Sequence, residues 1–100
     1  MKGIVWCTAF ERGCDKLTEI INKYVEWYGE EIIDTVIRTK YEYRIDFTNG
    51  DTWRVARATE SSRGVKANVS YIESNINEDI IQQIIKPCTT ALPFTAYNYY

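Results

Sequence analysis

The stretch "IVWCTAFERGCDKLTEII", residues 4–21, decides the fold, because it joins an apolar run to an amphipathic segment through a short polar stretch. Residues 3–7, GIVWC, are apolar throughout, as expected of a strand buried on both faces of a sheet. Apolar residues then recur at helical spacing, at Leu17, Ile20, Ile21, Tyr24, Val25 and Tyr28. Asp15 suits the positive N-terminal end of this predicted helix, and Gly29 ends it. The stretch therefore predicts a strand, a loop and a helix.

The next part of the chain predicts β-structure. From Asp34 to Phe47 the sequence is rich in β-branched and aromatic residues. Apolar residues alternate there with charged ones, at Tyr41, Tyr43, Ile45 and Phe47. Asn49-Gly50 is a strong hairpin signal, after which Trp53 and Val55 are expected to return antiparallel.

The remaining elements complete an α/β pattern. Residues 57–68 are predicted to form a loop with a turn at Arg63-Gly64, and NVSYIE, residues 68–73, a further strand. A short helix is expected to be capped by Asn77 and ended by Pro87, and a last strand is expected over 94–99. The prediction is a single α/β domain over residues 1–100, with two helices, a mixed sheet and an Asn-Gly hairpin.

Composition excludes several classes of function. The apolar fraction of 45% is that of a folded globular chain, and the net charge of −2 argues against a basic nucleic-acid-binding surface. A further hypothesis is that single-stranded nucleic acid binds with its bases stacked on Tyr41, Tyr43 and Trp53, but the negative net charge argues against it. No apolar run approaches the roughly 20 residues of a membrane span, and the N-terminus does not suit a signal peptide. We therefore expect a cytoplasmic protein that contacts neither membrane nor nucleic acid.

The side-chain inventory argues against catalysis and metal binding. Histidine is absent, which removes the commonest general base and the commonest metal ligand. Cys7 and Cys14 are not spaced like zinc ligands, and the odd number of cysteines, which includes Cys88, suits a reducing compartment. We expect no cofactor, no metal and structural cysteines.

The opening stretch also matches part of a phosphate-binding loop, GxxxxGK(S/T). Laid on Thr8–Asp15, Gly13 matches the second glycine, whereas Thr8 replaces the first glycine, Cys14 the lysine and Asp15 the magnesium-binding hydroxyl. Lys16 follows two residues too late to take the place of the lysine. Two interpretations stay open: an architectural strand-to-helix turn, or a site that holds phosphate through backbone N–H groups alone.

The second half of the chain resembles the ATPase core of the large terminase subunits, the DNA-packaging motors of bacteriophages. The resemblance rests on FTNGDTWRV, then Ser62-Arg63-Gly64, then NVSYIES, in that order. It places Glu73 at the magnesium-binding aspartate and Ser74 at the catalytic glutamate. With Cys14, Asp15 and Ser74 as they stand, the resemblance implies a reduced phage or prophage relative that has lost ATP hydrolysis.

Aromatic residues near two segment ends suggest a protein interface. Tyrosine and tryptophan favour such interfaces. The candidate interface residues are Trp27, Tyr28, Arg63, Tyr97, Tyr99 and Tyr100. The alternative for the tyrosines is a last strand that docks on the domain's own sheet.

Two functional hypotheses follow. The first is a non-enzymatic protein-interaction module that acts in virion assembly, forms a homo-oligomer, or inhibits a host or defence protein in the host cytoplasm. The second is a regulatory protein that binds a nucleotide or another phosphate-containing ligand, with Thr8, Gly13, Cys14, Asp15 and Glu73 as candidate site residues.

Overall fold

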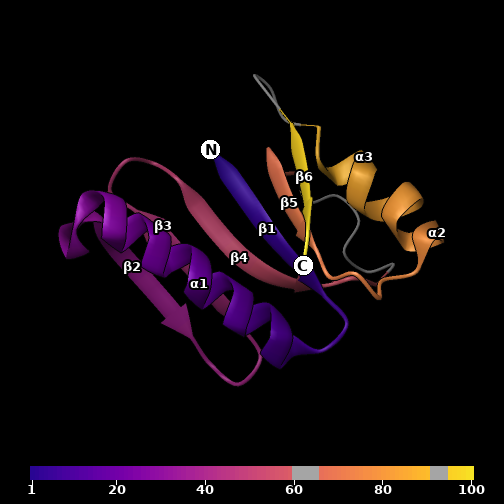
Figure 1. The fold of residues 1–100 in the computed structure, drawn as a ribbon, viewed down its shortest axis with the longest axis horizontal. Coiled ribbons are helices and arrows are strands. Elements are labelled where there is room, and N and C mark those ends of the chain that lie inside the picture. The colour runs from indigo at the N-terminus through magenta and orange to yellow at the C-terminus, as the bar shows by residue number, and fades with distance from the viewer. Residues whose placement is uncertain (60–65, 91–94) are drawn as a thin grey trace.

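The fold is built on a six-stranded sheet whose central strand is the apolar run at the start of the chain (Figure 1). The computed structural model describes residues 1–59, 66–90 and 95–100. Its strands are β1 (Lys2–Cys7), β2 (Ile33–Arg38), β3 (Tyr43–Phe47), β4 (Thr52–Arg57), β5 (Val69–Ile72) and β6 (Ala96–Tyr99). Its helical elements are α1 (Phe10–Tyr28), η1 (Glu30–Ile32), α2 (Glu78–Ile80), the π-helical η3 (Ile81–Ile85) and α3 (Lys86–Cys88). The predicted α/β class with a mixed sheet is confirmed.

The strand order is β2-β3-β4-β1-β5-β6. β1 is parallel to both of its neighbours, β4 and β5, and β6 is parallel to β5. β2, β3 and β4 are antiparallel to one another in chain order. Asn49 and Gly50 lie between β3 and β4, and Gly50 has a φ of 93°, a conformation that favours glycine. The sheet thus has a parallel half around β1 and an antiparallel half that ends at β2.

An apolar layer lies on each face of the sheet. Helix α1 packs on the face that contains Val5, Trp53 and Val69. The second helical segment, α2–η3–α3, packs on Ile4, Trp6 and Ile72 of the other face, because successive strand residues point to opposite sides. Figure 1 shows α1 crossing the sheet and the second segment lying beside β5 and β6. No helix in the described ranges is long and apolar enough to cross a membrane.

Helix α1 begins earlier than the sequence pattern predicted. It starts at Phe10, so Asp15 is its sixth residue rather than a member of its first turn, and only Thr8 and Ala9 link it to β1. The reason is that Phe10 and Gly13 extend the apolar face of Leu17 by about two turns towards the N-terminus. At the other end, Gly29 follows α1 with a φ of 85°, a backbone conformation that favours glycine.

The β-rich stretch from Asp34 forms two strands, β2 and β3, and in the turn between them the Thr39 hydroxyl accepts hydrogen bonds from the N–H groups of Tyr41 and Glu42. Two further expectations need correction. Tyr41 lies in that turn and is 80% exposed, not on a buried face. Pro87 does not end the second helix but lies in the first turn of α3, where a helix tolerates a residue without an N–H. Asn77 caps this helix as predicted.

Candidate functional site

The carboxyl ends of β1 and β5 form the place where an open α/β sheet usually binds a ligand. The two strands are parallel neighbours, with Trp6 opposite Ile72. The chain leaves β1 for α1 on one face and leaves β5 for the second helical segment on the other face. Open α/β sheets usually bind ligands at such a reversal, outside the carboxyl ends of the strands. We call this place the crevice; its residues are Thr8, Arg12, Glu73, Asn75 and Tyr100.

Glu73 and Thr8, which the sequence analysis singled out from distant motifs, meet in the crevice. Glu73 follows β5 directly and is 1% exposed, and its Oε2 accepts a 2.9 Å hydrogen bond from the Thr8 hydroxyl. Glu73 Oε1 has no hydrogen-bond partner among the described residues. The Arg12 guanidinium forms a long ion pair with it, with Nε 4.0 Å from Oε1. Thr8 also lies 3.4 Å from Asn75 Oδ1, so oxygen atoms from three side chains gather here.

The other residues of the predicted phosphate loop are parts of helix α1. The Gly13 N–H donates to the Ala9 carbonyl at 3.3 Å. A Cβ at Gly13 would lie 2.6 Å from Val55 Cγ1 and 2.9 Å from Cys7 Sγ, so this glycine allows α1 to approach the sheet closely. Cys14 is buried in the core, and Asp15 is exposed on the helix surface. Residues 10–15 therefore do not form a loop around a phosphate. Of the predicted loop residues Thr8, Gly13, Cys14 and Asp15, only Thr8 is hydrogen-bonded to Glu73.

Tyr100 is hydrogen-bonded to the ends of both β1 and β5. Its hydroxyl donates a 2.7 Å hydrogen bond to the Trp6 carbonyl at the end of β1, and its N–H donates to the Ile72 carbonyl at the end of β5. Lys16 lies 5.9 Å from the centre of its ring. Burial, reinforced by the nearby Cys7 and Glu73, raises the pKa of the Tyr100 phenol. Tyr100, predicted as an interface residue, is thus half-buried against its own sheet.

The thiols near the crevice are poor nucleophiles. Burial is the main cause that raises the pKa of Cys7 to about 11, and the Glu73 charge adds to it. Burial likewise raises the pKa of Cys14. Because the thiolate is the reactive form, both thiols stay protonated at neutral pH. In the described part of the chain no three His, Cys, Asp or Glu side chains gather as a metal site.

The remaining predicted interface residues lie in two separate places. Trp27 and Tyr28 are 65% and 56% exposed at the end of α1, where their rings contact Tyr24. Tyr97 and Tyr99 are 39% and 58% exposed on β6, an edge strand. Figure 1 shows the end of α1 and strand β6 on opposite sides of the molecule. Arg63 lies outside the described residues.

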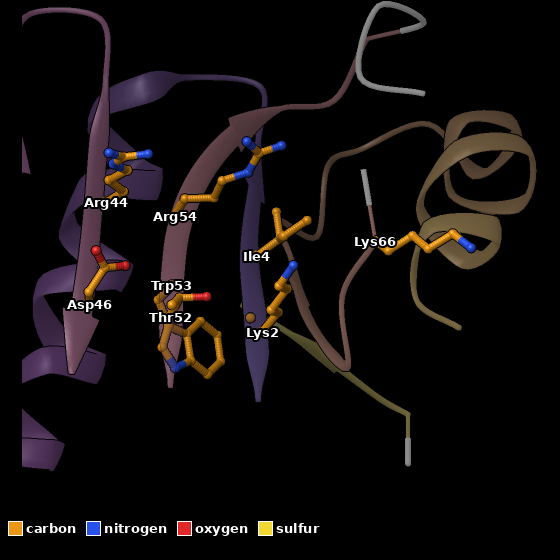
Figure 2. Close-up of a pocket in the computed structure, with 9 residues that line it drawn as sticks. Lys2, Ile4, Arg44, Asp46, Thr52, Trp53, Arg54 and Lys66 are labelled. Carbon is orange, nitrogen blue, oxygen red and sulfur yellow. The ribbon is translucent and has the colours of Figure 1, made fainter. Parts of the chain in front are cut away.

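Sequence reasoning missed a second candidate site, a basic groove on the face of the sheet that α1 does not cover (Figure 2). The groove has a volume of about 590 Å³. Its charged residues are Lys2, Arg44, Arg54 and Lys66, together with one carboxylate, Asp46. The alternation in YRIDF and TWRV places these arginines on one face, but only the strand register shows that they are neighbours.

Comparison with protein-family models, with curated proteins and with solved structures finds no match for this chain.

Proposed function

We propose that this protein is a non-enzymatic protein-interaction module on a P-loop-like α/β scaffold. One observation carries the proposal: the crevice, where this type of fold usually binds a small ligand, holds the protein's own Glu73 and Tyr100. A buried carboxylate next to the start of α1 repels an anion at the position where a phosphate would be stabilised by the helix.

The residues of the first helical turns support the same conclusion. A phosphate loop needs several free backbone N–H groups between strand and helix. Here the link is Thr8 and Ala9 alone, and the N–H groups of Arg12 and Gly13 both donate to the Ala9 carbonyl. Cys14 and Asp15 supply neither the lysine nor the hydroxyl that phosphoryl transfer uses.

Exposed aromatic side chains support binding of a protein. Trp27 and Tyr28 lie more than half exposed at the end of α1, and Tyr99 is exposed on the edge strand β6. Aromatic residues of this kind are enriched in protein interfaces, and an open edge strand offers backbone groups for pairing. A phage origin, with a role in assembly, oligomerisation or inhibition, stays a prediction from the terminase resemblance.

Calorimetric titration with magnesium-ATP, combined with capture of partners, tests the proposal. We expect a flat titration for the wild type and for Glu73→Gln. We also expect a protein from an extract of the source organism to form a stoichiometric complex that survives size-exclusion chromatography. Saturable ATP binding that Thr8→Val or Glu73→Gln alters would overturn the proposal in favour of the second hypothesis, a nucleotide-binding regulatory protein.

A further inference from the structure

Half of one sheet face carries no helical layer among the described residues. The second helical segment covers Ile4, Trp6 and Ile72, which are all at most 2% exposed. On the same face of β3 and β4, Arg44 and Arg54 are exposed, because no element packs over this antiparallel half in the described structure. Figure 2 shows their side chains on neighbouring strands, with Lys2 on β1 and Lys66 beside the helical segment.

The register of the sheet brings two positive charges together. Arg44 and Arg54 are direct cross-strand partners in the antiparallel β3–β4 pair. Like charges in this position destabilise a sheet. Arg44 has partial compensation from Glu42, whose Oε1 lies 3.5 Å from its Nε, whereas Arg54 has no ion pair with any described residue. The fold alone therefore does not explain this pair.

The positive charge is local to the groove. Four cationic side chains and one carboxylate line it, in a protein whose net charge is −2. Guanidinium groups present paired N–H donors that match the two oxygens of a carboxylate. Both arginines are exposed, so a ligand can reach them without displacing a helix.

We propose that this basic groove binds an extended segment of a partner protein that is rich in Asp and Glu. The inference rests on the proposed function and names the chemistry of the partner. An acidic protein segment fits better than single-stranded nucleic acid, because the groove offers no ring for base stacking. Its aromatic residue, Trp53, is 5% exposed, and its Nε1 donates to the Tyr24 hydroxyl on the α1 side.

Fluorescence anisotropy with a labelled peptide of alternating Glu and Gly tests the inference. A peptide of about ten residues is roughly 33 Å long when extended, similar to the 32 Å middle dimension of the protein. We expect saturable binding that weakens with added salt, and no binding of the matching Gln-Gly peptide. Arg44→Glu or Arg54→Glu should each weaken binding by about tenfold or more, because each substitution removes one charge-assisted hydrogen bond.

Lys23→Glu is the matched control, because Lys23 is an exposed residue of α1, on the other side of the sheet. It makes the same change in net charge, and we expect less than about a twofold effect. An equal loss with Lys23→Glu would overturn the inference, since net charge alone would then explain the binding. Circular dichroism confirms that each variant is folded.

Two further outcomes separate this inference from its alternatives. Tighter binding of an oligothymidylate of equal charge would overturn it in favour of nucleic acid. A captured protein partner that binds Arg54→Glu as tightly as wild type would overturn it but leave the proposed function intact. Nucleotide binding in the crevice would instead overturn the proposed function, without changing the anisotropy result.

Discussion

The hydroxyl of Thr8 donates a 2.9 Å hydrogen bond to the carboxylate of Glu73, and this bond joins the carboxyl ends of the parallel neighbours β1 and β5. It is the only hydrogen bond to the Glu73 side chain among the described residues. Because a buried carboxylate without hydrogen bonds is costly, the pair holds the crevice in its present form.

Thr8→Val should therefore destabilise the protein more than Thr8→Ser. The valine leaves both carboxylate oxygens of Glu73 without a donor, at a cost of about 1–3 kcal/mol. The serine keeps the hydroxyl and should stay within about 0.5 kcal/mol of wild type. Urea unfolding measures both. If Thr8→Val has the same effect in a Glu73→Ala background, which has no side-chain acceptor at position 73, the hydrogen bond is not the cause.

Gly13→Ala tests whether this glycine serves packing. An alanine improves helix propensity by about 1 kcal/mol, but its Cβ would lie 2.6 Å from Val55 Cγ1. Overpacking of this kind costs about 1–3 kcal/mol, so we expect a net loss of stability. Val55→Ala removes the contacting atom, and the double variant should recover part of the loss. Stabilisation by Gly13→Ala alone would contradict the packing role.

Tyr100→Phe removes the hydrogen bond to the Trp6 carbonyl and should cost about 0.5–1 kcal/mol. The cost is small because the Trp6 carbonyl also accepts the backbone N–H of Glu73, at 3.2 Å, and keeps a partner. Thermal unfolding measures the change. Tyr97→Phe is the control, since its hydroxyl makes a longer contact, 3.4 Å from the Thr89 carbonyl. A larger effect at Tyr97 would argue against this role of Tyr100.

The elevated thiol pKa predicts a loss of stability at alkaline pH. The pKa of Cys7 is about 11 in the folded protein against an ordinary value of 9.0, chiefly because the thiol is buried. Folding therefore favours the protonated thiol. The contribution of this thiol to the free energy of unfolding is complete below pH 9.0 and is lost as the pH rises towards 11. Tyr24 and Tyr100, whose pKa values are also raised by burial, act in the same direction at higher pH.

Urea unfolding at a series of pH values should show this decline, and Cys7→Ala should make it shallower between pH 9 and 11. The tyrosines should leave a residual decline in that variant. An identical profile for wild type and Cys7→Ala would show that the thiol does not contribute. Slow alkylation of Cys7 by iodoacetamide in the native state is the matching chemical expectation.

Local periodicity predicted the elements, but it did not predict all of their boundaries. The spacing from Leu17 to Tyr28 gave the body of α1, and Gly29 its end. The pattern did not predict that the helix starts at Phe10, because glycine is unfavourable inside a helix. Gly13 is present there because α1 packs closely against Val55. Such a contact is not visible in the sequence of the helix itself.

The two candidate sites differ in how far they could be predicted from the sequence. Thr8 and Glu73 each follow a central strand, so their meeting could be anticipated from strand order. The basic groove could not, because Arg44 and Arg54 become neighbours only through the register of β3 and β4. A net charge of −2 averages over all faces and hides a local cluster of cations.

Arg54→Glu should raise stability. In the wild type, Arg44 and Arg54 face each other as like charges, and a glutamate at position 54 turns this pair into an attractive one. Opposite charges across an antiparallel pair contribute about 0.2–1 kcal/mol, and the gain should shrink in high salt. Thermal unfolding at low and high ionic strength measures it, with Arg54→Leu as the control that removes repulsion without adding attraction. A loss of stability in Arg54→Glu would mean that the two guanidinium groups do not repel each other in the folded protein.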